Sequence, residues 1–336
     1  MDNVLVIGAG SWGTAFAAYL VRNGHGVRLW VREPELAEAI ASRHENTLFL
    51  PGIGLPPSLA PVTDLAAAVA QSELLVLAVP SKFMRTTLTP LAGRLDHIQG
   101  LVNLSKGIEA GSQKTLSEVA MEVLGLETID RWTTLSGPSF ALEVAQGHPS
   151  ALVAAAVRES NAVRVQQLFS SPQIRIYRST DLTGVEIGGS IKNVMAIASG
   201  MIAGLGFGTN TTATMVTRAS VEISRLGVAL GARPETFFGL AGIGDLMLTC
   251  FGSLSRNYQL GRRIASGETL EQALAATPMV AEGVETARAV QALANAKGID
   301  MPIVAQVHEV LFRGKPPAEA MGELMTRSLK SEWITK

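Results

Sequence analysis

The sequence predicts an α/β fold for the first part of the chain and an all-α fold for the rest. Three observations support this prediction. An apolar strand at the N-terminus leads into a glycine-rich turn, short apolar strands then alternate with helical segments, and helical periodicity alone continues from residue 181 onwards. A chain of 336 residues is long enough for two domains. We expect the first, with a mostly parallel sheet, at residues 1–178 and the second at residues 179–336.

The first expected strand, residues 4–7, runs directly into the sequence GAGSWG. In a dinucleotide-binding turn, Gly8 makes the tight bend, Gly10 lets the backbone approach the phosphates, and Gly13 lets the next helix pack closely on the strand. A helix and a second strand follow, at residues 14–22 and 27–31. This context predicts a Rossmann-type dinucleotide-binding domain, with a glycine-rich structural turn as the alternative.

The alternation of strands and helices continues through the first domain. Further strands are expected at residues 74–79, 101–104, 133–135, 151–157 and 174–177. Helices are expected at residues 34–41 and 64–70, the second capped by Asp64, whereas residues 43–53 are interpreted as a loop because proline and glycine interrupt them. Strands that are apolar on both faces are typical of a parallel sheet covered by helices.

The second domain is expected to be almost entirely helical. Its helices are predicted at residues 182–200, 211–230, 255–266, 285–296 and 301–312. The most apolar run, residues 194–207, is shorter than the ~20 residues of a membrane-spanning helix. We therefore expect a buried helix there and no membrane insertion.

Composition limits the compartment and the partners. The net charge is −1 and no basic run is present, so nucleic acid is an unfavourable partner. The single cysteine, Cys250, excludes a disulfide within the chain and fits a reducing compartment. Because the N-terminus enters a strand without a basic leader, we expect a cytoplasmic protein.

The residues that follow the second strand bear on the choice of cofactor. Arg32 can pair with a 2′-phosphate, and Glu33 can accept hydrogen bonds from ribose hydroxyls. We therefore expect NADPH to be accepted and leave the use of NADH open; an ordinary surface arginine is the alternative. Lys106 follows the strand at residues 101–104 and should project into the same crevice, unless it is a solvated surface lysine.

Clusters of small and polar residues occur at residues 136–141, 188–193, 242–250 and 255–257. Lys192 is the most informative residue among them, because it lies between two glycines and the long apolar run. A buried lysine needs a partner, and Asn193 and Asp245 are the candidates. The alternative is a lysine that reaches solvent from a helix end.

At these clusters the sequence closely resembles the bacterial type of NAD(P)-dependent glycerol-3-phosphate dehydrogenase. The resemblance spans nearly the whole chain, with motifs in family order at residues 8–13, 43–46, 50–52, 105–109, 136–141, 192–193, 244–250 and 255–257. It implies the reversible reduction of dihydroxyacetone phosphate to sn-glycerol 3-phosphate with NADPH or NADH, which supplies the backbone of membrane phospholipids.

The resemblance also implies roles for individual residues. Lys192 would be the catalytic proton donor and acceptor, held with the substrate hydroxyls by Asp245 and Thr249. Burial, or a nearby cation such as Lys106 or Arg256, should lower the pKa of Lys192. The implied substrate-binding residues are Lys106, Gly137, Ser139, Lys192, Asp245, Ser255, Arg256 and Asn257. The implied cofactor-binding residues are Gly8, Gly10, Ser11, Trp12, Gly13, Arg32, Lys106, Ala141, Arg256, Val280 and Glu282.

Arg256 is our choice for the substrate phosphate, because its guanidinium offers a planar fork of donors. Tyr258 stands where another basic residue is often found in the family, so a further phosphate contact is not expected there. No metal is expected, because no cluster of histidine and cysteine has metal-ligand spacing. The alternatives are a 3-hydroxyacid dehydrogenase or ketopantoate reductase type of enzyme and a nucleotide sensor without catalysis. A homodimer is the candidate oligomer.

Overall fold

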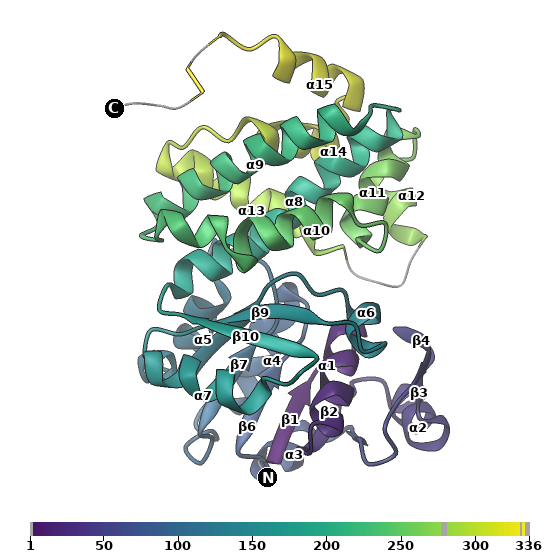
Figure 1. Ribbon diagram of the computed structural model, residues 1–336, viewed down its shortest axis with the longest axis vertical. Helices are drawn as coiled ribbons and strands as arrows, with labels where there is room; N and C mark the ends of the chain where they lie inside the picture. Colours follow the sequence, from purple (N-terminus) through teal and green to yellow (C-terminus); the bar gives the residue numbers. More distant parts are fainter. Residues whose placement is uncertain (1–2, 277–280, 330, 333–336) are drawn as a thin grey trace.

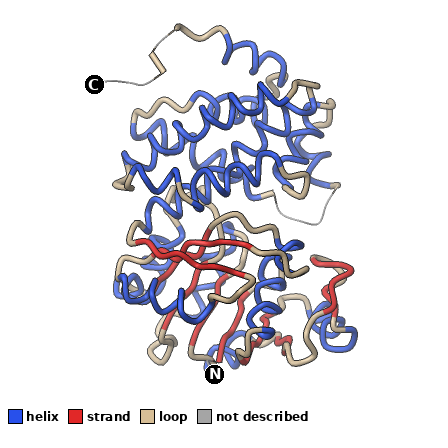
Figure 2. The backbone as a smooth tube through the Cα atoms, in the orientation of Figure 1, coloured by secondary structure: helices blue, strands red, loops and turns tan. Residues whose placement is uncertain are grey.

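The protein has a sheet domain and a helical domain in contact with each other, as seen in a computed structural model that describes residues 3–276, 281–329 and 331–332 (Figure 1). All the strands lie in one domain, and the other contains only helices and loops in its described residues (Figure 2). The predicted Rossmann-type domain followed by an all-α domain is therefore confirmed.

The central sheet has eight strands in the order β10-β9-β8-β7-β6-β1-β2-β5. Every neighbouring pair is parallel except β8 with β9, which is antiparallel. The strands are β1 (Asn3–Ile7), β2 (Gly26–Trp30), β5 (Ala60–Val62), β6 (Leu74–Leu77), β7 (Gly100–Asn103), β8 (Trp132–Ser136), β9 (Ser150–Ala155) and β10 (Ile174–Ser179). The residues of β6 and β7 are buried throughout, because helices cover both faces of the sheet.

The sheet domain has more helices than the sequence predicted. Those covering the sheet or connecting its strands are α1 (Ser11–Arg22), α2 (Pro34–Arg43), α3 (Leu65–Ala70), α4 (Met84–Leu88), α5 (Leu116–Leu124), α6 (Ala141–Ala145) and α7 (Glu159–Phe169), with single turns η1 (Ser81–Phe83), η2 (Thr89–Leu91) and η3 (Leu126–Arg131). Asp64 caps α3 as expected, through a hydrogen bond from Ala67 N at 3.0 Å. The missed helix α5 has a capping box of Thr115 and Glu118, a signal that was readable in the sequence.

The expectation of a loop at residues 43–53 is wrong in part. Strands β3 (Glu45–Asn46) and β4 (Leu50–Gly54) form a small antiparallel pair there. The Asn46 side chain donates hydrogen bonds to Ala9 O and to Thr14 Oγ1, both at 2.8 Å. These contacts connect the pair to the start of α1 and could not be read from local sequence.

The helical domain is arranged around α8 (Leu182–Gly204), which is buried over most of its length. Residues 194–202 of the apolar run are buried within it, as expected. Within the described residues, no helix combines the length and the apolarity needed to cross a bilayer. The other elements are α9 (Thr209–Ala229), η4 (Pro234–Phe238), η5 (Leu240–Gly244), α10 (Asp245–Phe251), α11 (Arg256–Ala265), α12 (Leu270–Ala275), α13 (Glu282–Lys297), α14 (Pro302–Arg313) and α15 (Pro317–Met325).

Close packing of α11 on α8 depends on glycine. A Cβ on Gly261 of α11 would lie only 2.1 Å from Ile197 O of α8, and one on Gly200 of α8 would lie 2.0 Å from Tyr258 O. Neither position can carry a side chain without separating the helices. The first turn of α11 is therefore held directly beside the middle of α8.

Candidate active site

The glycine motif adopts the geometry that a dinucleotide needs. Gly8 has φ +117°, and a Cβ on Gly13 would lie 2.0 Å from Gly8 O, so the turn is tight and α1 packs closely on it. At Gly10 no heavy atom lies within 4 Å of the position of a Cβ. No side chain caps the start of α1. The free space beside Gly10 and the uncapped start of α1 therefore fit a bound pyrophosphate.

Two further predicted cofactor residues, Ser11 and Trp12, lie within this motif, and a third, Ala141, lies near it. Ser11 Oγ donates a hydrogen bond to Phe49 O at 2.6 Å. Trp12 and Ala141, which are far apart in sequence, pack against the same small cluster around Ala15. Trp12 also contacts Phe16, with ring centroids 5.6 Å apart. The structure thus brings the first turns of α1 and α6 together.

Arg32 lies after β2 and is largely exposed, with 64% of its side chain accessible. Its Nη2 and Nε donate hydrogen bonds to Glu33 Oε1 at 2.7 and 3.0 Å. Its guanidinium carbon also lies 5.6 Å from the centre of the Phe83 ring. Both residues predicted to face the adenosine ribose are therefore present, but they are paired with each other.

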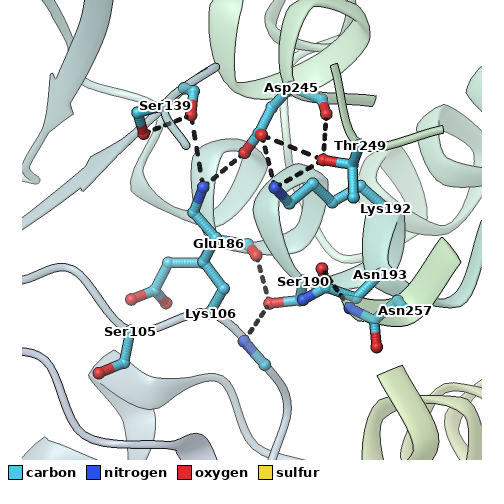
Figure 3. A network of polar contacts seen from close by, with 12 residues as sticks. Ser105, Lys106, Ser139, Glu186, Ser190, Lys192, Asn193, Asp245, Thr249 and Asn257 are labelled. Atoms are coloured by element: carbon cyan, nitrogen blue, oxygen red, sulfur yellow. Dashed lines mark hydrogen bonds and ion pairs between the residues drawn. The ribbon is translucent and has the colours of Figure 1, made fainter. Parts of the chain in front are cut away.

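The centre of the site is a carboxylate held between two lysines (Figure 3). Lys192 Nζ donates to Asp245 Oδ1 at 2.5 Å, and Lys106 Nζ donates to Asp245 Oδ2 at 2.6 Å. Lys106 comes from the loop after β7, whereas Lys192 and Asp245 come from the helical domain. The three charges therefore form a contact across the domain interface.

Thr249 completes the surroundings of Lys192. Its Oγ1 accepts a hydrogen bond from Lys192 Nζ at 2.9 Å and donates one to Asp245 O at 2.6 Å. Of the two partners expected for Lys192, Asp245 is confirmed. Asn193 has a different partner: its Oδ1 accepts a hydrogen bond from Asn257 Nδ2 at 3.0 Å.

Local backbone geometry places these side chains. Asp245 is the first residue of α10 and follows the distorted turn η5, where Gly242 departs from helical geometry (φ −98°, ψ −107°). On α8, a Cβ at Gly189 would lie 2.8 Å from Ser136 Oγ and 3.7 Å from the Lys106 side chain. The glycine therefore leaves room for Lys106 to reach Asp245 between the two domains.

Burial and charge adjust the proton affinity of the cluster. Burial lowers the pKa of Lys192 to about 8; the Asp245 charge opposes this shift and the Lys106 charge adds to it. For Asp245, burial opposes ionisation, but the two lysines outweigh burial and hold its pKa below the ordinary value. Lys106 is the neighbouring cation that lowers the pKa of Lys192. The Arg256 charge instead favours the ionised form of Glu282.

Two predicted substrate residues of the sheet domain, Gly137 and Ser139, follow β8 and lie beside Lys106. Lys106 Nζ donates to Gly137 O at 3.4 Å, and Ser139 Oγ donates to the same carbonyl at 3.1 Å. Gly137 has φ +140°, which favours glycine. These three predicted residues are therefore brought together beside Asp245.

The predicted substrate residues of α11 are held by the helical domain. Ser255 caps the helix, and its Oγ accepts a hydrogen bond from Tyr258 N at 3.3 Å. Asn257 Oδ1 accepts a hydrogen bond from Gly283 N at 3.0 Å, in addition to the bond from its Nδ2 to Asn193. Arg256 is exposed at the first position of the helix.

Glu282 begins α13 and interacts with the sheet domain, because the Ser81 backbone amide favours its ionised carboxylate. Burial raises the pKa of Glu282, although Arg256, Lys106 and Lys192 oppose the shift. Val280, the other predicted residue of this segment, lies outside the described residues.

Sequence reasoning missed a buried carboxylate beneath the site. Glu186 of α8 accepts hydrogen bonds from Ser117 Oγ at 2.6 Å and from Thr134 Oγ1 at 2.8 Å. Burial raises its pKa. Ser190 Oγ, one turn later, donates to Glu186 O at 2.6 Å and accepts from Gly107 N at 2.9 Å. These contacts hold the helix that bears Lys192 against the sheet. The sequence signal that could have predicted them is Glu186 itself, a charged residue within an apolar helical segment.

In the part of the chain that the structure describes, no group of three or more histidine, cysteine, aspartate or glutamate side chains could hold a metal ion.

Comparison with known proteins gives a consistent assignment. The family models for the N-terminus and the C-terminus of NAD-dependent glycerol-3-phosphate dehydrogenase match residues 3–162 and 181–322. A protein of Geobacter sp. (strain M21), named glycerol-3-phosphate dehydrogenase (NAD(P)+), is 48% identical over 333 residues, which cover 99% of each chain. One of the same name from Trichlorobacter lovleyi is 50% identical over 327 residues, covering 97% of this chain and 98% of the relative.

A crystal structure of glycerol-3-phosphate dehydrogenase from Coxiella burnetii superposes with a TM-score of 0.92 at 34% identity, covering 97% of this chain and 99% of that one. The similarity thus includes both domains and the interface between them, where Lys106, Lys192 and Asp245 meet. The chain belongs to the NAD-dependent glycerol-3-phosphate dehydrogenase family.

Proposed function

We propose that the protein catalyses the reversible reduction of dihydroxyacetone phosphate to sn-glycerol 3-phosphate with NADPH or NADH. The observation that carries the proposal is the pairing of Asp245 with two lysines. Asp245 pairs with Lys192 within the helical domain and with Lys106 across the domain interface. It combines a proton donor with a site for an anionic substrate, beside a dinucleotide-binding turn. Membership of the family supports the choice of substrate.

The cofactor, when bound, supplies the hydride for reduction and takes it up in oxidation. In the proposal, the glycine turn and the first turn of α1, with Gly8, Gly10, Ser11, Trp12 and Gly13, hold the pyrophosphate, and Arg32 faces the adenosine end. Ala141 and Glu282 border the same cofactor. No heavy atom lies within 4 Å of a Cβ position at Gly10 and no side chain caps the start of α1, which supports this placement.

Lys192 is the proposed proton donor and acceptor. An ammonium group has three N–H donors, and two of those of Lys192 are directed at Asp245 and Thr249. The third is left for the substrate oxygen. In reduction the ammonium gives its proton to the carbonyl oxygen and stabilises the developing negative charge; in oxidation the neutral amine removes the hydroxyl proton.

The substrate phosphate is proposed to bind at the start of α11. Arg256 is exposed there, and the backbone amides of the first turn favour an anion. Ser255 and Asn257 shape this end of the site, while Lys106, Gly137 and Ser139 approach the substrate from the sheet domain. Because the site provides for a phosphate, an unphosphorylated ketone should be a poor substrate.

The proposal extends to the biological role, the compartment and the oligomeric state. The product is a precursor of the phospholipid backbone, so we assign the protein to phospholipid synthesis. A buried, free Cys250 is compatible with the cytoplasm. A homodimer is supported only by exposed apolar side chains such as Phe238, which is 72% exposed. We keep residues 1–178 and 179–336 as the two domains, since β10 ends at Ser179 and α8 begins at Leu182.

The proposal is tested by following NADPH oxidation with dihydroxyacetone phosphate, unphosphorylated dihydroxyacetone, and 2-oxo and 3-oxo acids as substrates. We expect turnover with the phosphorylated ketone and little with the others. Turnover only with the oxo acids would identify another two-domain reductase, as in the 3-hydroxyacid dehydrogenase or ketopantoate reductase alternative. NADPH binding without turnover of any substrate would favour the nucleotide sensor.

A further inference from the structure

Two cations lie about a single aromatic ring at the adenosine end of the proposed cofactor site. The Arg32 guanidinium carbon lies 5.6 Å from the centre of the Phe83 ring, and Lys82 Nζ lies 4.9 Å from it. Arg32 follows β2, whereas Lys82 and Phe83 belong to η1, the turn after β6. In a parallel α/β sheet, ligands bind at the carboxyl ends of the strands, where both segments lie.

The two cations differ in whether a carboxylate already pairs with them. Arg32 donates two hydrogen bonds to the Glu33 carboxylate, so the pair carries no net charge. Lys82 is exposed and takes part in none of the hydrogen bonds or ion pairs found among the described residues. The group formed by Arg32, Glu33 and Lys82 therefore has a net charge of about +1, all of it due to Lys82.

The backbone that carries Lys82 is fixed. Its neighbour Ser81 is buried, and the Ser81 amide favours the ionised carboxylate of Glu282 in the helical domain. A Cβ on Gly107 would lie 2.5 Å from Ser81 Oγ, so the turn also packs tightly on the neighbouring loop. The ammonium of Lys82 is thus presented from a rigid turn toward the same ring as Arg32.

We propose that Lys82 is the residue that discriminates NADPH from NADH, by pairing with the 2′-phosphate that only NADPH carries. A phosphate monoester has a charge of about −1.5 to −2 at pH 7, which an arginine already paired with a carboxylate does not balance. Lys82 supplies the missing charge, and Glu33 remains available to the ribose hydroxyls of NADH. This inference rests on the proposed function, because it assumes a nicotinamide dinucleotide at this site.

The test uses two nucleotides that lack the nicotinamide, so it does not depend on turnover. The affinities of 2′,5′-ADP and 5′-AMP are measured by titration calorimetry for the wild type, Lys82→Gln, Lys82→Arg and the control Lys297→Gln, an exposed lysine at the end of α13. We expect Lys82→Gln to weaken 2′,5′-ADP binding about tenfold, the effect of one charge-assisted hydrogen bond, and to change 5′-AMP binding less than about twofold. Lys82→Arg and Lys297→Gln should keep the wild-type affinities.

Two results would overturn the inference: unchanged 2′,5′-ADP binding in Lys82→Gln, or equal weakening of both nucleotides. A wild type that binds the two nucleotides equally well would also exclude a 2′-phosphate site.

Steady-state assays then separate this inference from the proposed function. A protein that reduces dihydroxyacetone phosphate but fails the calorimetric test keeps its function and loses the Lys82 assignment. One that passes the calorimetric test but reduces no dihydroxyacetone phosphate keeps the nucleotide site and loses the function.

Discussion

At the scale of single residues, the chemistry depends on how three charges share a small volume. Burial disfavours the ammonium form of Lys192, Asp245 favours it, and Lys106 disfavours it again. The result is a pKa of about 8, so both the protonated and the neutral form are populated near neutral pH. A lysine on the surface, with its ordinary pKa near ~10.4, would rarely be neutral enough to accept a proton.

The two directions of the reaction should therefore respond to pH in opposite ways. In the proposed mechanism, reduction needs the Lys192 ammonium as proton donor, so its kcat should fall as pH rises through about 8. Oxidation needs the neutral amine, so its kcat should rise over the same interval. Initial rates at saturating substrate between about pH 6 and pH 10 in both directions check this expectation. Parallel profiles in the two directions would show that another group controls the proton transfer.

At the scale of elements, helix packing positions the site. Glu186 anchors α8 to β8 and α5, which places Lys192 about one and two-thirds turns further along the same helix. The distorted turn η5 directs α10 so that Asp245 faces Lys192. The α8–α11 crossing brings Asn257 to Asn193. Each functional side chain is thus oriented by a contact between helices that are distant in sequence.

The α8–α11 crossing gives a prediction about stability. Gly261→Ala would place a methyl group 2.1 Å from Ile197 O, so we expect a loss of roughly 1–3 kcal/mol in the free energy of unfolding. Gly322→Ala is the matched control, because Gly322 is also helical but has no heavy atom within 4 Å of its Cβ position. Urea unfolding followed by circular dichroism compares the two variants. Equal stability in both would mean that the helices do not need this glycine.

A second prediction at this scale concerns the junction of α9 and α14. Glu222 of α9 accepts hydrogen bonds from Ile303 N at 2.9 Å and Val304 N at 3.4 Å, which caps α14. Burial outweighs these donors and raises the pKa of Glu222 to about 7. The folded state therefore holds the Glu222 proton more tightly than the unfolded state. The resulting contribution of Glu222 to the free energy of unfolding is complete below its ordinary pKa of 4.5 and is lost as pH rises through 7.

Glu222→Gln, which keeps an oxygen to accept the amide hydrogen bonds, should remove this dependence. We expect the unfolding free energy of the wild type to fall, relative to the variant, by roughly 2–3 kcal/mol between pH 5 and pH 8. Denaturant unfolding at several pH values measures the difference. A constant difference across the range would contradict the assignment of this pKa shift to Glu222.

At the scale of the whole molecule, the active site exists only where the two domains meet. The sheet domain contributes the dinucleotide turn and Lys106, and the helical domain contributes Lys192, Asp245 and Thr249. Glu282 adds a second connection, because the Ser81 amide of the sheet domain favours its ionised carboxylate. Neither domain alone holds the complete set of groups.

Much of this architecture was predictable because it depends on local pattern. The apolar strands at β6 and β7 and the periodicity of α8 can be read directly from the residues. The long-range partners were harder to predict. Asp245 was one of two candidates for Lys192, and the pairing of Asn193 with Asn257 was not expected. The β3–β4 pair was missed because contacts with the start of α1 stabilise it more than any turn signal of its own.

The central claim is that Lys192 transfers the proton at this interdomain site. Its most direct test is turnover of dihydroxyacetone phosphate by Lys192→Met, measured together with NADPH binding by calorimetry. Lys315→Met is the control, since Lys315 is also a partly buried, ion-paired lysine, 18% exposed beside Glu323. We predict that kcat falls by about 10²–10⁴ in Lys192→Met while the NADPH affinity stays within about twofold, and that Lys315→Met keeps the wild-type kcat. A kcat of Lys192→Met equal to that of the wild type would contradict the account.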